Sequence, residues 1–184
     1  MNEPRVTTIL KESNLLDFSM VRQDIMARAQ NFGHVVHKIT ELWDLGTLNI
    51  DSVDPAAVLC FEGWKKFRKD FDLSFKPEEI EHRLTSKLGF SGTPDRWHTE
   101  KGILVDIKSS SSMLPAVAIQ TAAYQILIEE NTGIKIKKRI GVQLTEKGYK
   151  IEPYDDRADR AVFLSCLNVY RWKQRHNMLD KRQQ

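Results

Sequence analysis

Two short strings, Gly-Thr-Pro-Asp ending at Asp95 and Asp-Ile-Lys beginning at Asp106, carry the charged groups that a metal-dependent hydrolase needs. The segment 96–105 between them has the pattern of a strand, a turn and a second strand. If the turn is Glu100-Lys101, antiparallel pairing places Asp95 directly opposite Asp106, where two carboxylates repel each other. A bound divalent cation would convert that repulsion into coordination. Lys108 would share the face of Asp106, because strand residues two apart point the same way.

The context of these strings is more informative than either string alone. Asp-x-Lys occurs by chance in many chains, but here it follows the apolar run Ile103-Leu104-Val105, which is typical of a buried strand. The next predicted helix carries Gln120 and Tyr124 four residues apart, and therefore stacked on one face. Taken alone, this pair fits a hydrogen-bonded helix edge as well as it fits a site. Together, two acids, an ammonium and two hydrogen-bonding groups indicate metal-assisted attack on a phosphodiester.

The elements that must position these residues follow from hydrophobic periodicity and from the breakers Gly, Pro and Asn. In the N-terminal third, Gly33 is expected to separate two helices, and Asp54 and Pro55 are expected to begin a third. Asn131 and Gly133 are expected to end the helix that carries Gln120 and Tyr124. The predicted helices are 17–31, 34–45, 54–71, 115–130 and 156–177, and the predicted strands are 84–90, 94–99, 103–108, 134–144 and 149–152.

This order predicts an α/β fold with a central mixed β-sheet flanked by helices and a helical N-terminal part. The first three strands are expected to form a meander. We find no linker or repeat, and predict a single domain over residues 1–184. Within it, 1–78 would be the helical N-terminal part, 79–153 the sheet core with its inserted helix, and 154–184 the C-terminal helix.

The composition is that of an ordinary folded domain, with 184 residues, 41% hydrophobic and 29% charged. No apolar stretch reaches the roughly 20 residues that span a bilayer, and the first residues lack the pattern of a secretory signal. We therefore expect no membrane association and a cytoplasmic protein. Cys60 and Cys166 fall in predicted helices, without the spacing of a metal motif, so buried reduced thiols are expected.

The formal net charge of +3 does not by itself identify a nucleic-acid binder. Two basic runs stand out, one at 65–69 and one from Arg171 onward. Such runs are usually solvated helix faces, and they permit phosphate contact without proving it. A Gly-x-x-x-x-Gly-Lys-Ser/Thr loop is absent, so use of ATP is not expected.

In their order along the chain, Gly-x-x-Asp, Asp-x-Lys and Gln-x-x-x-Tyr resemble the motifs of the RecB-type branch of the PD-(D/E)XK nucleases. An N-terminal helical segment with Gly33, His37 and Glu41 also resembles that branch. The opening 6–10, Val-Thr-Thr-Ile-Leu, is similar to the start of small phage-type exonucleases and of the mitochondrial genome maintenance exonuclease. The resemblance extends from about residue 6 to residue 125, and it implies a restriction-endonuclease-like core.

The resemblance also implies roles for individual residues. Asp95 and Asp106 would be metal ligands together with the carbonyl of Ile107, and His37 would add an imidazole that Mn²⁺ tolerates better than Mg²⁺ does. His37 fits the spacing from Gly33 better than His34, although a core histidine is the alternative. Lys108, with its own pKa lowered, would position or deprotonate the attacking water. Gln120 and Tyr124 would hold a phosphate or the metal-bound water. Glu81 and Glu41 would be supporting acids, Glu81 as a salt-bridge partner.

The expected cofactors are one or two Mg²⁺ or Mn²⁺ ions. Relatives that hold an iron–sulfur cluster use four cysteines, whereas this chain has two, so no such cluster is expected. The expected partner is DNA, single- or double-stranded, together with proteins of recombination or replication in a bacterial or phage-infected cell.

The predicted function is that of a divalent-metal-dependent DNA nuclease, an exonuclease of DNA processing, recombination or repair. Three alternatives stay open. The chain could be a structure-specific endonuclease, a catalytically silent nuclease fold that binds DNA or a partner, or an α/β domain in which the motif arose by chance.

Overall fold

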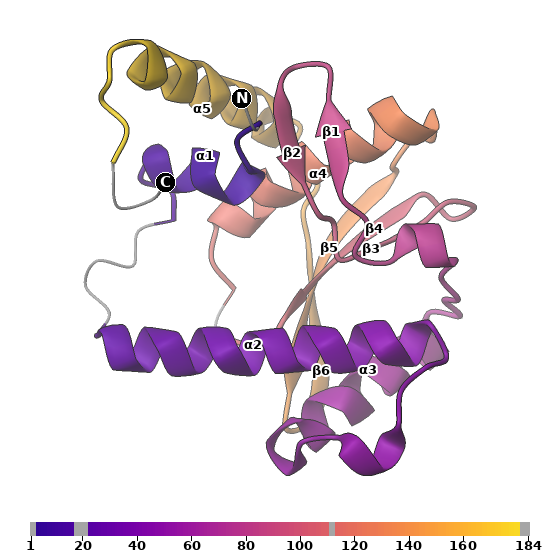
Figure 1. Ribbon diagram of the computed structural model, residues 1–184. Coiled ribbons are helices and arrows are strands. Elements are labelled where there is room, and N and C mark those ends of the chain that lie inside the picture. The colour runs from indigo at the N-terminus through magenta and orange to yellow at the C-terminus, as the bar shows by residue number, and fades with distance from the viewer. Residues whose placement is uncertain (1–2, 17–21, 111–112, 181–184) are drawn as a thin grey trace.

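The computed structural model describes residues 3–16, 22–110 and 113–180, and it shows a sheet between two layers of helices (Figure 1). The sheet order is β3-β4-β5-β6, with β4 and β5 parallel and the other neighbours antiparallel. The mixed sheet and the flanking helices agree with the predicted fold class. The strands are β3 (Arg96–His98), β4 (Ile103–Lys108), β5 (Lys138–Thr145) and β6 (Gly148–Pro153).

One helical layer contains α2 (Gln23–Asp44) and α3 (Val58–Asp70), and the other contains α1 (Val6–Glu12), α4 (Ala116–Thr132) and α5 (Ala158–Arg175). In the described part of the chain, 3₁₀ turns lie in the connections at Ile50–Ser52, Pro55–Ala57 and Pro77–Glu79. A separate two-stranded ribbon is formed by β1 (Leu84–Ser86) and β2 (Phe90–Gly92). The sheet is therefore covered on both faces.

The side chains of β4 alternate between the two layers, as the pleat of a strand requires. Val105 and Ile107 belong to the apolar cluster that contains the residues of α2 and α3, whereas Leu104 belongs to the cluster of α1, α4 and α5. Asp106 shares the face of Leu104, so its side chain projects toward the layer of α4. This alternation directs an acid from a buried strand toward Gln120 and Tyr124.

Several predicted elements are confirmed. β4 has the predicted bounds, and the pairing of Arg96 with Val105, continued by one residue, places Asp95 across from Asp106. α4 ends at Gly133, whose φ of 72° is the left-handed conformation of a helix C-cap. The hairpin of β5 and β6 turns at the predicted place. Asp54 also caps the turn that precedes α3, where its carboxylate accepts a hydrogen bond from the amide of Ala56 at 2.9 Å.

The prediction that Gly33 breaks a helix was wrong, because α2 continues through it from Gln23 to Asp44. A single helical glycine costs only about 1 kcal/mol relative to alanine, and the burial of Val36 and Ile39 further along α2 offsets that cost. The predicted start of this helix, at 17, lies outside the described residues.

The predicted three-strand meander was also wrong, because residues 84–92 form the separate ribbon of β1 and β2. Gly89, with a φ of 68°, reverses the chain between these strands. α1 was not predicted, although Val6, Ile9 and Leu10 are buried at helical spacing. β5 begins at Lys138 rather than 134, because the amides of Lys137 and Lys138 donate to the carbonyl of Gly102.

Among the described residues, no helix is both long enough and apolar enough to cross a membrane. Cys60 and Cys166 are buried, as predicted, and they lie in the two different apolar clusters. The division into a single domain with three parts stays a prediction.

Candidate active site

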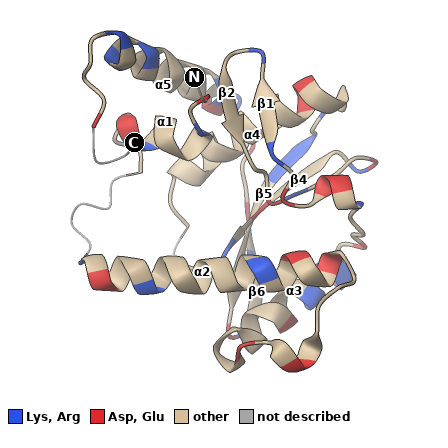
Figure 2. Ribbon diagram, in the orientation of Figure 1, with Lys and Arg blue, Asp and Glu red and all other residues tan. Residues whose placement is uncertain are grey.

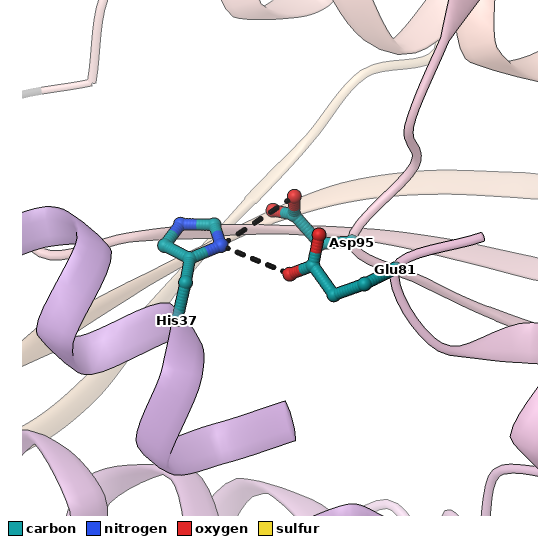
Figure 3. A group of neighbouring side chains, drawn as sticks. All are labelled: His37, Glu81 and Asp95. Atoms are coloured by element: carbon teal, nitrogen blue, oxygen red, sulfur yellow. Dashed lines mark hydrogen bonds and ion pairs between the residues drawn. The ribbon is translucent and has the colours of Figure 1, made fainter. Parts of the chain in front are cut away.

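An imidazole and two carboxylates from three separate segments converge on one point of the molecule (Figure 3). Nδ1 of His37 lies 3.2 Å from Oε1 of Glu81 and 3.6 Å from Oδ1 of Asp95. One ligand atom from each residue lies within 4.8 Å of the other two. We call His37, Glu81 and Asp95 the acid–imidazole group.

Each member of this group is placed by a different element. His37 projects from α2, whereas Asp95 immediately precedes β3. Glu81 lies just before β1 with a φ of 46°, a left-handed conformation that is unfavourable for a residue with a side chain. Its amide donates to the carbonyl of Asp95 at 3.0 Å, which joins the two acidic segments. A strained conformation that the surroundings enforce is frequent at functional sites.

A second set of side chains surrounds Asp106, which is fully buried. Nζ of Lys108 lies 2.6 Å from Oδ2 of Asp106. Nε2 of Gln120 lies 3.4 Å from Oδ1 of the same carboxylate and donates to the hydroxyl of Tyr124 at 3.0 Å. We call these four residues the acid–lysine group, and they are the ones that sequence spacing had associated.

The backbone of Ile107 connects the two groups. Its amide donates to Oδ2 of Asp95 at 2.6 Å, and its carbonyl lies 3.1 Å from Nε2 of His37. The carbonyl that sequence reasoning expected among the metal ligands therefore faces the imidazole. Asp106 lies outside the acid–imidazole group, whereas Glu81, expected only as a salt-bridge partner, lies inside it.

Burial and mutual repulsion alter the ionisation of the acids. Burial raises the pKa of Asp95, and the charge of Glu81 adds to that shift. Burial also raises the pKa of Asp106, to about 6, and the charge of Asp95 contributes while Lys108 opposes the shift. Asp95, directly before β3, faces Asp106 of β4 across the strand pairing, and each charge opposes the ionisation of the other carboxylate.

The two basic groups respond in the opposite sense to burial. Burial by itself lowers the pKa of His37, but the charges of Asp95 and Glu81 outweigh it and raise the pKa to about 9. The pKa of Lys108 is also raised, because Asp106 and Asp95 outweigh the effect of burial. The expected lowering of the Lys108 pKa is therefore not found. Lys108 is an ammonium here, suited to neutralising charge rather than to removing a proton.

The acid–imidazole group has the donors that a divalent cation of the Mn²⁺ or Mg²⁺ type prefers, namely carboxylate oxygens with one imidazole. A ligating histidine normally donates its other N–H to a carboxylate or a carbonyl, and Nε2 of His37 is placed to do so toward Ile107. In addition, Oδ2 of Asp106 is a buried oxygen without a hydrogen bond of good geometry in the described residues. The donor set therefore fits a divalent ion.

A buried charge network lies behind the acid–imidazole group, and sequence reasoning missed it. Arg96 is fully buried, and its guanidinium contacts Asp44 at 2.6 Å, the carbonyl of Asp95 at 2.5 Å and Glu81 at 3.4 Å. Asp44, at the end of α2, also accepts from Arg68 at 2.6 Å and from Trp64. The available signal was an arginine directly after Asp95 in a strand that must be buried.

Sterics explain why the first residue of the Gly-x-x-Asp motif, Gly92, is a glycine. A Cβ on Gly92 would lie 2.7 Å from Cε1 of Tyr124 and 2.9 Å from Cδ1 of Leu127, closer than real contacts allow. The absence of a side chain at 92 therefore lets the ring of Tyr124 pack against the end of β2.

Glu41, predicted as a supporting acid, lies apart from the site and pairs with Lys38 at 2.9 Å on the surface of α2. His34, the alternative to His37, is exposed.

Several side chains of the two basic runs already have partners within the protein. Lys65, Lys66 and Arg68 form ion pairs, Arg171 contacts the carbonyl of Leu88, and Lys173 contacts Glu12. Acidic and basic positions are interspersed along α2 (Figure 2).

No family model matches the chain, and no curated protein matches it. Among solved structures, the chain is similar to a crystal structure from Eubacterium rectale that is named "Putative exonuclease". The TM-score is 0.51 at 14% sequence identity, and the match covers 81% of this chain and 69% of the other. At this identity, the likeness establishes a shared fold.

Proposed function

We propose that the protein is a divalent-metal-dependent DNA nuclease that acts as an exonuclease. The observation that carries the proposal is the acid–imidazole group next to the buried Asp106–Lys108 pair. The order of its motifs and the fold shared with a protein named as an exonuclease support membership of the RecB-type PD-(D/E)XK nucleases. A role in DNA processing, recombination or repair belongs to the same proposal.

His37, Glu81 and Asp95 would hold the cation, and Asp106 would complete the negative charge around it. A divalent ion bound there would lower the pKa of a water molecule and offset the charge that develops on the phosphate. The ammonium of Lys108, held against Asp106, would stabilise that developing charge from the side of β4.

Gln120 and Tyr124 would orient the phosphate. The hydroxyl of Tyr124 accepts a hydrogen bond from Gln120, so its own proton is left to donate to a phosphate oxygen. Burial, with the charges of Asp95 and Asp106, raises the pKa of Tyr124. The phenol therefore stays protonated and acts as a donor throughout the neutral range.

The test is incubation of the protein with end-labelled single-stranded DNA, end-labelled double-stranded DNA and covalently closed circular DNA, with Mn²⁺, with Mg²⁺ or with EDTA. We expect the linear substrates to be shortened from their ends and the circle to survive. Cleavage of the circle would instead identify an endonuclease.

Matched variants connect the activity to the site. Asp106→Asn and Lys108→Ala are each expected to lose at least about 100-fold in rate, because transition-state charge stabilisation is worth several kcal/mol. Lys147→Ala, in the exposed turn between β5 and β6, serves as the control lysine. Parental activity in the Asp106→Asn protein would contradict the proposal, and absence of activity in the parent with either metal would favour a silent binding module.

A further inference from the structure

A small polar pocket of about 170 Å³ is lined in part by Tyr124, which also belongs to the acid–lysine group. It is built from the residue before α1 and the start of α1, the residue before β1, the end of β2 with the residue that follows it, and one residue of α4. Its polar lining residues are Arg5, Thr7, Arg83, Ser91, Thr93 and Tyr124. We call it the arginine pocket.

Its two cations lack acidic partners. Arg5 and Arg83 are both exposed, and across residues 3–16, 22–110 and 113–180 neither forms an ion pair with a carboxylate, whereas the buried or half-buried Arg68, Arg96 and Lys108 each do. Arg83 instead donates to the hydroxyl of Ser91 at 3.3 Å. Ser91 is fully buried, and Tyr124 is only 5% exposed. The pocket thus combines two exposed guanidinium groups that no carboxylate neutralises with the hydroxyls of the buried residues Ser91 and Tyr124.

The arginine pocket is continuous with the site through two residues. Tyr124 lines the pocket and also bonds Gln120, which contacts Asp106. Thr93 lies two residues before Asp95, on the segment that follows β2. A group bound in the pocket would therefore contact Tyr124, the residue that the proposed function places against the phosphate.

We propose that the arginine pocket binds the terminal phosphate of a nucleic-acid strand and so selects the end from which the strand is digested. This inference rests on the proposed nuclease function and adds the chemistry of the substrate end. A terminal phosphomonoester carries a charge of about −1.5 to −2 at neutral pH, whereas an internal phosphodiester carries −1. Two uncompensated guanidinium groups match the terminal group, and guanidinium binds phosphate oxygens through paired N–H donors. The hydroxyls of Thr7, Ser91 and Thr93 supply further hydrogen bonds.

The 5′ and 3′ phosphates have the same chemistry, so the experiment must separate them. Four single-stranded oligonucleotides of one sequence are compared, with a phosphate or a hydroxyl at either the 5′ end or the 3′ end. In each, phosphorothioate linkages block the opposite end. Initial rates in Mn²⁺ are measured for all four ends with the parent, Arg5→Ala, Arg83→Ala, Arg83→Lys and Arg157→Ala. Arg157 is an exposed arginine before α5 and serves as the control.

We expect the parent to digest one phosphorylated end at least tenfold faster than the corresponding hydroxyl end. Arg5→Ala and Arg83→Ala should reduce that ratio toward one, Arg83→Lys should retain part of it, and Arg157→Ala should leave it unchanged. Equal rates at phosphate and hydroxyl ends in the parent would overturn the inference while leaving the nuclease proposal intact. The same conclusion would follow if the alanine variants slowed both kinds of end equally.

Binding decides the question even if the parent digests none of these substrates. Fluorescence anisotropy with the Asp106→Asn protein compares the same four oligonucleotides without turnover. Tighter binding of a phosphorylated end, lost in Arg83→Ala, would support the arginine pocket although the nuclease proposal had failed. Equal affinity for all four ends would overturn it. Melting temperatures of each variant establish that the comparison is made on folded protein.

Discussion

The carboxylate of Glu81 belongs both to the acid–imidazole group and to the buried charge network. It lies 3.2 Å from His37 and 3.4 Å from Arg96, and its backbone adopts a left-handed conformation to reach that position. A residue held in this way contributes geometry as well as charge to a cation site.

Replacing Glu81 by glutamine should weaken metal binding, because the change removes one of the two negative charges facing the imidazole while retaining the shape of the side chain. We expect the Kd for Mn²⁺, measured by isothermal titration calorimetry, to rise at least about tenfold. Glu41→Gln, on the same side of the molecule but paired with Lys38 on the surface, should leave that Kd unchanged. Equal effects of the two substitutions would place the cation elsewhere.

Proton release should accompany metal binding at His37. Its pKa of about 9 means that the imidazole is protonated at pH 7.5, and a nitrogen that coordinates a metal must lose its proton. Binding should therefore release about one proton, and the affinity should rise roughly tenfold per pH unit until pH 9. Titration in two buffers with different ionisation enthalpies measures this number. Identical apparent enthalpies in the two buffers would exclude His37 as a ligand.

At the scale of elements, the glycines of two helices provide a matched pair. Gly33 lies inside α2, and a Cβ there would meet only Oγ of Ser109 at an ordinary 3.7 Å. Gly133 caps α4 with a φ of 72°, and no atom lies within 4 Å of the position that its Cβ would occupy. The backbone conformation at Gly33 therefore does not require glycine, whereas the left-handed conformation at Gly133 favours it.

Gly33→Ala should stabilise the protein by about 0.5–1 kcal/mol, because alanine has the higher helix propensity. Gly133→Ala should destabilise it by about 1 kcal/mol, because the left-handed conformation penalises a Cβ. Urea denaturation of both variants measures the two free energies of unfolding. A loss of stability in Gly33→Ala would show that the approach to Ser109 is tighter than its distance implies.

Local sequence patterns predicted those elements whose boundaries are set locally. β4 is bounded by a turn glycine and by the serines after Lys108, and α4 ends where Gly133 adopts its φ. The pairing of β3 with β4 followed from the length of one turn. The ribbon of β1 and β2 was missed because its separation from the sheet depends on contacts with α1 and α4, which short windows of sequence do not contain.

The candidate site was predictable to the same extent. Motif spacing brought Asp106, Lys108, Gln120 and Tyr124 together, since all lie on β4 and the next helix. The sequence did not predict that Glu81 belongs to the acid–imidazole group, or that Arg96 and Asp44 form the buried charge network. Both arrangements depend on how α2 lies against the sheet, and residues separated by about fifty positions have no local signal.

At the scale of the whole molecule, the charge network around Arg96 connects the helical layer of α2 and α3 to the sheet. The side chain of Asp44, at the end of α2, is completely buried and is shared by Arg68 of α3 and Arg96 of β3. It therefore holds one helical layer against the strand that leads out of the acid–imidazole group.

Asp44→Ala should cost about 3–5 kcal/mol of stability, because it leaves the guanidinium of Arg96 buried without its main counter-ion. Asp70, the last residue of α3, is the matched control, since it pairs with Lys66 and Tyr149 at the surface. Asp70→Ala should have a much smaller effect in the same thermal unfolding experiment. Similar melting temperatures for the two variants would show that the network contributes little net stability.

His37 reaches the acids from α2, whereas the acids themselves belong to the sheet and its connections. A cation bound between them would link α2 to the sheet. Amide hydrogen exchange should then slow along α2 when Mn²⁺ is added, while β4, already buried on both faces, should change little. The occupancy of the site could thus be measured on a helix that carries one of its ligands.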